Sequence, residues 1–209
     1  MYLSGYLYQQ YEIYLYTNRI NVSKRYSIKD VYYYDIPSTE NISKYTIGSN
    51  STMTYDSSNE SYLLTKTTNA DNSSFLFKNI TFSDNITVVN DFKLLSSTTN
   101  IQTGFIVNNI YFRIIYAPGV SVYRITITRD KTIDLQIQDC QVSLDKWYHL
   151  KLTIENKIAT LTLEDKEDNS SIASITYDLS SYLTSNNTIG YIIGYNTNSK
   201  VLVKNLIMQ

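Results

Sequence analysis

Trp147-Tyr148-His149-Leu150 opens the stretch that decides the fold, which runs from Leu144 to Gln209. Apolar residues recur at every second position from there to Ile154, and a Gly-Tyr-Ile-Ile-Gly-Tyr segment at 190–195 leads into Val203-Lys204-Asn205-Leu206. Alternation of this kind is typical of a β-strand with one buried face, because successive side chains point to opposite sides of the strand. The stretch therefore predicts consecutive antiparallel strands.

The same pattern continues toward the N-terminus. Short β-branched and aromatic runs are separated by turns rich in Asn, Asp and Ser, since the chain has only 6 Gly and 2 Pro, and no amphipathic helix is evident. Spacings of about 8–15 residues between strands are typical of an all-β antiparallel β-sandwich of the jelly-roll kind. Strands are expected at residues 42–47, 53–55, 62–65, 75–78, 86–94, 104–107, 111–116, 122–128, 133–138, 147–154, 159–163, 172–177, 189–194 and 201–208.

Residues 1–34 form a separate segment in which tyrosine is unusually dense. The whole chain holds 21 Tyr against 6 Phe. Because exposed strands present unpaired edges that proteins normally cover, we expect this segment to be an N-terminal arm or a set of extra strands covered by another copy or another protein. The alternative is compositional drift, since Asn, Ile, Lys and Ser are enriched together with Tyr. Residues 35–209 are expected to form the sandwich domain.

Composition excludes several classes of partner. A formal net charge of −1 leaves no basic footprint for nucleic acid, and no window of about 18 apolar residues predicts membrane insertion. A single cysteine rules out an intramolecular disulfide, and the N-terminus lacks the pattern of a secretory signal. Two locations fit: a virion whose proteins assemble inside a cell, or the cell surface and extracellular space as part of a larger protein.

Residues 144–209 resemble the end of a laminin-G-like, or concanavalin A-like, jelly-roll domain. The resemblance extends over about 35–209 and implies a non-catalytic carbohydrate-recognition or adhesion module, of the kind found in viral tail or fibre proteins and adhesins. The alternative is a structural virion or cell-surface protein that contacts only other proteins, and a glycosidase is less favoured. The residues that carry the resemblance are Trp147, His149, Leu150, Leu152, Ile154, Ala159, Leu161, Leu163, Gly190, Ile192, Gly194, Val203, Asn205 and Ile207.

The residues needed for catalysis are scarce, so we expect no enzyme. His149 is the only histidine and lies in an alternating strand, where we expect it to have a structural role, and Cys140 has no nearby basic cluster. One His and one Cys exclude the usual zinc sites. Glycoside hydrolysis needs two facing carboxyl groups, whereas the acidic run at 164–168 is explained by a solvated turn.

The central strands predict a polar surface suited to sugars. Sugar recognition uses aromatic rings against pyranose faces and planar polar groups for the hydroxyls. The alternative is a solvated sheet face with cross-strand Arg–Asp pairs. Alternation directs Phe112, Ile114, Ile125, Ile127, Ile133, Leu135 and Ile137 to the core, and it directs the predicted ligand-binding residues Tyr111, Arg113, Arg124, Thr126, Asp134 and Gln136 to the opposite face.

Calcium is the one cofactor that the resemblance suggests. Calcium takes several oxygen ligands, and some similar domains clamp their termini with a metal, which singles out Asp35 at the start of the sandwich. The alternative reading of Asp35 is an ordinary turn aspartate. The expected partners are cell-surface carbohydrate and other copies of the chain or other virion or surface proteins, with multivalency compensating for weak single sites.

Overall fold

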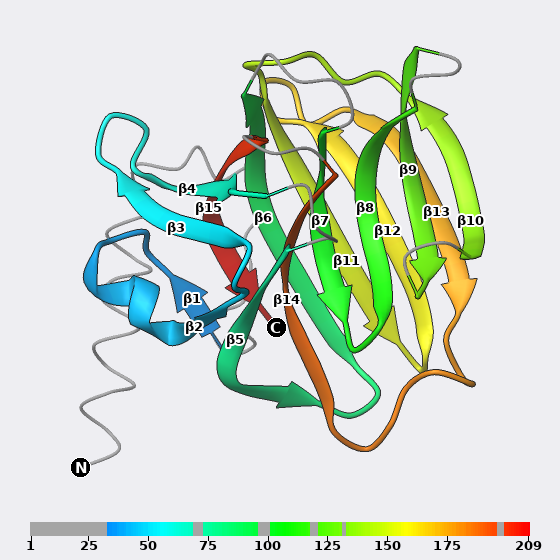
Figure 1. The fold of residues 1–209 in the computed structure, drawn as a ribbon. Helices are drawn as coiled ribbons and strands as arrows, with labels where there is room; N and C mark the ends of the chain where they lie inside the picture. The colour runs from blue at the N-terminus through cyan, green and yellow to red at the C-terminus, as the bar shows by residue number, and fades with distance from the viewer. Residues whose placement is uncertain (1–32, 69–72, 96–100, 118–120, 131–132, 196–198) are drawn as a thin grey trace.

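The computed structural model describes residues 33–68, 73–95, 101–117, 121–130, 133–195 and 199–209 (Figure 1). These residues form two antiparallel β-sheets packed face to face, so the predicted all-β sandwich is confirmed. A single 3-10 helix, η2 (Glu40–Lys44), interrupts the strands among the described residues. None of these residues belongs to a helix with the length and apolar character needed to span a membrane.

The eight-stranded sheet contains the C-terminal stretch that decides the fold. Its strand order is β13-β12-β11-β6-β15-β4-β3, and β1 adds to β15. All of its strand pairs are antiparallel. The strands are β1 (Tyr33–Asp35), β3 (Ser51–Asp56), β4 (Ser61–Lys66), β6 (Ile86–Leu95), β11 (Trp147–Glu155), β12 (Ile158–Asp165), β13 (Ser171–Asp178) and β15 (Lys200–Met208).

The seven-stranded sheet covers it and contains the central strands. Its order is β10-β9-β8-β7-β14-β5-β2, again antiparallel throughout. Figure 1 shows β7, β8, β9 and β10 in front of the strands of the other sheet. The strands are β2 (Tyr45–Ile47), β5 (Ser73–Phe82), β7 (Ile101–Val107), β8 (Ile110–Ala117), β9 (Val122–Arg129), β10 (Ile133–Cys140) and β14 (Asn187–Tyr195).

The core lies between the sheets and follows the sequence alternation. In β11, Leu150 and Leu152 are fully buried, whereas their neighbours Lys151 and Thr153 are only half-buried. Large rings from the other sheet complete the same cluster, including Tyr191 of β14. Alternation also predicted correctly that Phe112, Ile114, Ile125 and Ile127 are buried.

Strand β10 departs from the predicted alternation because it contains a β-bulge. Asp134 lies opposite Thr128 but Gln136 lies opposite Ile127, so Leu135 is an extra residue. A bulge shifts the following side chains to the other face. Gln136 therefore lies on the same side of the sheet as Ile127, and not on the side of Thr126 as predicted, although it remains exposed on this edge strand. The expected burial of Ile133 and Ile137 is also wrong, since they are 42% and 43% exposed.

The first described residues also refine the predictions. Residues 42–44 lie in η2 rather than in a strand, and β2 begins only at Tyr45. Tyr33 and Tyr34 pair with Met208 and Ile207, so two described residues before the expected domain boundary already belong to the sheet. The remainder of the predicted N-terminal arm lies outside the described residues.

Candidate functional site

The outer face of the seven-stranded sheet carries most of the residues predicted to bind a ligand. Cross-strand pairing places Arg113 beside Thr126, Tyr111 beside Thr128, and Thr128 beside Asp134. Gln136 is excluded from this face by the bulge. We call the following set the outer polar surface: Gln102, Tyr111, Arg113, Arg124, Thr126, Thr128, Asp134 and Asp139.

The centre of the outer polar surface is buried. Arg113 is only 3% exposed. Its Nη1 donates a 2.8 Å hydrogen bond to Oε1 of Gln102. Its guanidinium carbon lies 5.6 Å from the centroid of the Tyr111 ring. A buried charge needs such partners, so Gln102 and Tyr111 hold the Arg113 guanidinium in a fixed position.

Two threonine hydroxyls in this surface have no partner. Thr126 and Thr128 are buried, and neither Oγ1 atom has a hydrogen-bond partner in the part of the chain that the structure describes. Leaving a buried hydroxyl unpaired costs about 1–3 kcal/mol. Thr126 and Thr128 are 2% and 0% exposed, so a ligand on the solvent side of the sheet does not reach these hydroxyls.

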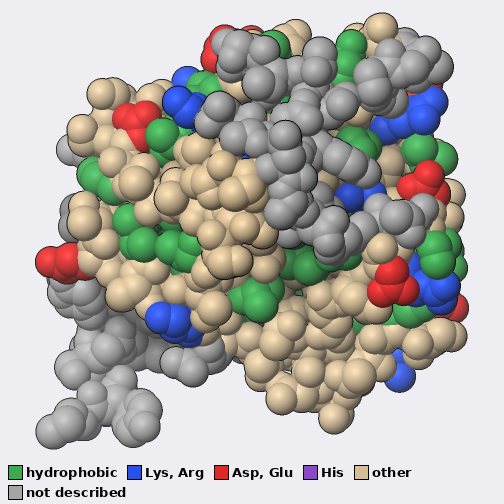
Figure 2. Space-filling model, viewed as in Figure 1, with side chains coloured by type: hydrophobic (Ala, Val, Ile, Leu, Met, Phe, Trp, Pro, Cys, Tyr) green, Lys and Arg blue, Asp and Glu red, His purple; other side chains and the backbone are tan. Residues whose placement is uncertain are grey.

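The solvent-exposed side of the outer polar surface lies on β9 and β10. Nε of Arg124 lies 2.8 Å from Oδ1 of Asp139, and the side chains are 31% and 64% exposed. Asp134 is exposed on the same edge strand. Figure 2 shows side chains of both charges along the side of the molecule where β9 and β10 lie. This Arg–Asp pair is the cross-strand pair expected of a solvated face, and it also offers planar polar groups to a ligand.

An apolar cluster adjoins these polar groups on the same face. Ile106 lies opposite both Tyr111 and Gly190, and Tyr111, Ile106 and Ile192 pack together with Leu76 outside the main core. The outer face thus combines aromatic, aliphatic and hydrogen-bonding groups on the consecutive strands β10, β9, β8, β7, β14 and β5.

The outer face of the eight-stranded sheet contains a network that sequence reasoning missed. Asp91 has no exposed surface, and its carboxylate contacts Nδ1 of His149 at 2.8 Å, Nδ2 of Asn205 at 2.6 Å and Nζ of Lys166 at 3.2 Å. Burial alone would raise the pKa of Asp91, but these partners lower it below its ordinary range. The network joins β6, β11, β15 and the turn after β12, so no local motif signals it.

A shallow hollow of about 410 Å³ lies at one end of this sheet. Its described lining includes one carboxylate, Glu155. Glycoside hydrolysis uses a pair of carboxyl groups, and the side chains in the described lining of this hollow supply one. The lining residues are Asn85, Ile86, Thr87, Thr153, Ile154, Glu155, Asn156 and Gln209.

The acidic run at 164–168 has a structural explanation in its turn. Nζ of Lys146 lies 2.7 Å from Asp165 and 3.2 Å from Glu167. Asp165 also accepts a hydrogen bond from the backbone N–H of Glu167, and Asp168 accepts one from that of Ser170. These carboxylates organise a tight turn, as the sequence interpretation proposed.

Asp35 does not fit a calcium site. It is buried, accepts a hydrogen bond from the hydroxyl of Tyr45, and has Nζ of Lys44 3.7 Å from its Oδ1. A lysine ammonium repels a cation, and calcium requires several oxygen ligands. Within the described ranges, no group of three or more His, Cys, Asp or Glu side chains could hold a metal ion. The assignment of Asp35 as a calcium ligand is therefore not supported.

Comparison with known proteins defines the class of fold. No protein-family model matches the chain, and no curated protein matches its sequence. A Bacillus subtilis protein of unknown function with a galectin-like fold superposes with a TM-score of 0.65 and 13% identity, covering 86% of this chain and 96% of the other. Peanut lectin gives a TM-score of 0.63 and 9% identity, covering 84% and 95%.

Two further structures extend this comparison. Lectin I from Ulex europaeus, in complex with the methyl glycoside of α-L-fucose, has a TM-score of 0.60 and 13% identity, covering 84% and 95%. A sialidase has a TM-score of 0.58, but the match covers only 19% of its chain. At these identities the likeness establishes the fold alone: an antiparallel β-sandwich of the jelly-roll type, which these lectins and the galectin-like protein share.

Proposed function

We propose that this protein is a non-catalytic carbohydrate-recognition module that binds through its outer polar surface. The lectin-like fold supports a carbohydrate partner, because similar structures include lectins in complex with sugars. The observation that carries the proposal is the solvent-exposed Arg124–Asp139 pair, with Asp134 exposed on the same edge strand. Sugar hydroxyls both donate and accept hydrogen bonds, so they suit a guanidinium that lies beside carboxylates.

Binding at this surface would be weak for a single site. Each sugar hydroxyl exchanges hydrogen bonds with water for hydrogen bonds with protein, so the net gain per bond is about 1 kcal/mol. Presentation of several copies would raise the avidity. We therefore propose an adhesive role in a viral tail or fibre protein or in a surface protein, located on a virion or outside the cell. A structural protein that contacts only other proteins is the alternative.

The test is a glycan array probed with the protein in multivalent form, comparing the natural chain with an Arg124→Ala/Asp134→Ala variant. Both side chains reach solvent, so the variant is expected to keep a melting temperature close to that of the natural chain while its glycan binding falls at least tenfold. Lys151→Ala/Glu155→Ala removes one charge of each sign from β11 of the other sheet and is the matched control.

Arg124 forms an ion pair only with Asp139 among the described residues, so its replacement breaks no other ion pair there. Arg113→Ala is less informative, because it leaves the buried Gln102 without its guanidinium partner and will destabilise the sheet. If the natural chain binds no glycan on the array, the result would favour the structural alternative. Release of free sugar from a bound glycan would favour a glycosidase.

A further inference from the structure

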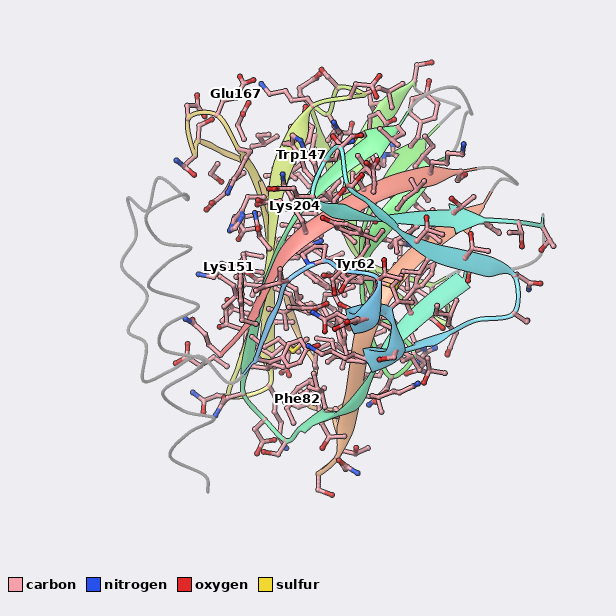
Figure 3. All side chains as sticks on the ribbon, turned by 90° about the vertical axis from the view of Figure 1, so that its left-hand side faces the viewer. Tyr62, Phe82, Trp147, Lys151, Glu167 and Lys204 are labelled. Atoms are coloured by element: carbon pink, nitrogen blue, oxygen red, sulfur yellow. The ribbon has the colours of Figure 1, made fainter. Side chains whose placement is uncertain are left out.

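Two lysine ammonium groups converge on one indole ring at the outer face of the eight-stranded sheet. Nζ of Lys204 lies 4.3 Å from the centroid of the Trp147 ring, and Nζ of Lys93 lies 5.0 Å from it. Trp147 and Lys93 are direct cross-strand partners of β11 and β6, and Lys204 comes from β15. Figure 3 shows Trp147 and Lys204 close together on this side of the molecule.

Both ammonium groups also contact Asn59 in the turn between β3 and β4. Nζ of Lys93 donates to Oδ1 of Asn59 at 3.0 Å, and Nζ of Lys204 donates to its backbone oxygen at 3.4 Å. A lysine ammonium has three N–H donors. One donor of each lysine is thus assigned to Asn59, and the turn fixes both charges at one place.

Neither lysine forms an ion pair with a carboxylate of the described residues. Asp91, which lies opposite Lys204, already contacts His149, Asn205 and the third lysine, Lys166. Its two oxygens therefore serve other partners. Lys93 and Lys166 thus lie near Lys204, and the neighbouring carboxylates are Asp91, Glu60 and, beside Lys93, Asp56.

Lys204 lies among charges of both signs. Burial lowers its pKa, attraction to Asp91 and Glu60 opposes this change, and repulsion from Lys93 and Lys166 adds to it. An anionic group between Lys93 and Lys204 would remove this repulsion. Trp147 is half-buried and supplies an apolar floor beside it.

We propose that Lys93, Lys204 and Trp147 form a second site, on the opposite sheet from the outer polar surface, that binds the sulfate or carboxylate group of an acidic polysaccharide. The choice of a polysaccharide rests on the proposed function. The net charge of −1 does not favour nucleic acid, which needs a broader basic surface. A compact cluster of lysines instead suits the binding of a single sulfate or carboxylate group.

Trp147 makes the test direct because it is the only tryptophan in the chain. Its fluorescence is recorded while the protein is titrated with sulfated dextran, polygalacturonate, neutral dextran and polyphosphate. Sulfated dextran or polygalacturonate is expected to change the Trp147 emission saturably, and the difference between them identifies sulfate or carboxylate as the preferred group. Neutral dextran is expected to leave the emission unchanged, and binding is expected to weaken as salt is added.

Lys93→Gln/Lys204→Gln is expected to reduce affinity for the acidic polymer at least tenfold. Lys151→Gln/Lys200→Gln removes the same charge from the same sheet at positions that do not contact Trp147, and is expected to reduce it less than twofold. Melting temperatures verify that each variant is folded. Equal losses in both variants, no emission change with either acidic polysaccharide, or tighter binding of polyphosphate would overturn the proposal.

The two proposals fail independently. Loss of glycan binding in the Arg124→Ala/Asp134→Ala variant concerns the outer polar surface and leaves the Trp147 signal in place. A missing Trp147 response with intact array binding refutes only the acidic site. A Trp147 response without any array binding to neutral glycans refutes the outer polar surface but retains the site around Lys93 and Lys204.

Discussion

Nδ1 of His149 lies 2.8 Å from Oδ1 of Asp91, its direct cross-strand partner, and that carboxylate has no exposed surface. The two residues are 58 positions apart in the chain. Asn205 and Lys166 hold the other carboxylate oxygen. One buried charge therefore connects three adjacent strands and a turn on the outer face of the eight-stranded sheet.

Asp91→Asn is expected to lower the free energy of unfolding at pH 7 by about 2 kcal/mol or more, because it leaves His149, Asn205 and Lys166 without their charged acceptor. The pKa of Asp91 is lowered in the folded chain. Its contribution is therefore complete above the ordinary aspartate pKa and is lost as the pH falls through the lowered value. Urea denaturation at pH 7 and at successively lower pH measures the difference, which should shrink in acid.

Asp84→Asn is the control for this prediction. Asp84 is a half-exposed aspartate whose contact with Lys157 is 3.9 Å long, so its replacement should change stability by less than about 0.5 kcal/mol. A similar loss in both variants, or a loss in Asp91→Asn that does not depend on pH, would contradict the role assigned to the network.

Asp35→Asn is expected to have the opposite dependence on pH. Burial raises the pKa of Asp35, although the hydrogen bond from Tyr45 and the charge of Lys44 act against this. The natural chain thus loses stability as pH rises from the ordinary aspartate pKa through the raised value. Asparagine keeps an acceptor for Tyr45 without the charge, so the variant should be more stable at pH 7 by about 1 kcal/mol.

Melting temperatures between pH 3 and pH 7 test this prediction, with Glu40→Gln in the neighbouring η2 as the exposed control. The advantage of Asp35→Asn should grow with pH and be absent from the control. The difference in melting temperature between Asp35→Asn and the natural chain should be the same in the presence of calcium as in the presence of a chelator. A stabilisation by calcium that disappears in Asp35→Asn would restore the metal site.

The fold was predictable because its core uses strict alternation. Leu150 and Leu152, and likewise Ile125 and Ile127, are buried at every second position as the sequence indicates. The bulge at Leu135 was not predictable. An edge strand accommodates an extra residue without disturbing the core, so the alternation of apolar residues gives no sign of it. Because of this one extra residue, Gln136 lies on the opposite side of the sheet from the side that alternation predicts.

The two candidate sites also differ in how far the sequence could predict them. Residues of the outer polar surface lie on sequential hairpin strands, so local alternation was enough to group Tyr111, Arg113 and Thr126. The cluster around Trp147 depends on which distant strands become neighbours. Lys93 and Lys204 meet because β6 pairs with both β11 and β15, and that order is a property of the whole sandwich.

Gly104→Ala is expected to destabilise the chain by more than about 3 kcal/mol, which is enough to prevent recovery of soluble protein. Gly104 has a φ of +152°, and a Cβ there would lie 2.0 Å from the backbone oxygen of Phe112. Backbone atoms of a central strand cannot move aside. Gly190→Ala should behave similarly, because its Cβ would lie 2.5 Å from the backbone oxygen of Phe75.

Gly48→Ala tests whether close approach is the cause. Its nearest atom would be 3.3 Å away, so we expect only a small change in the yield and melting temperature of that variant. Normal melting of Gly104→Ala would show that β7 and β8 are less closely paired than the structure indicates.

Cys140 is expected to be inert toward thiol reagents in the folded protein. The residue is buried at the end of β10, and burial, together with the charge of Asp139, raises the pKa of its thiol to about 12. Because the thiolate is the reactive form, labelling by a chromogenic disulfide at pH 8 should be at least 100-fold slower than in urea. Cys140 is the only cysteine, so the colour reports on this residue alone. Labelling at the unfolded rate without urea would show that the β10 edge opens readily and that Arg124 and Asp139 do not hold it against β9.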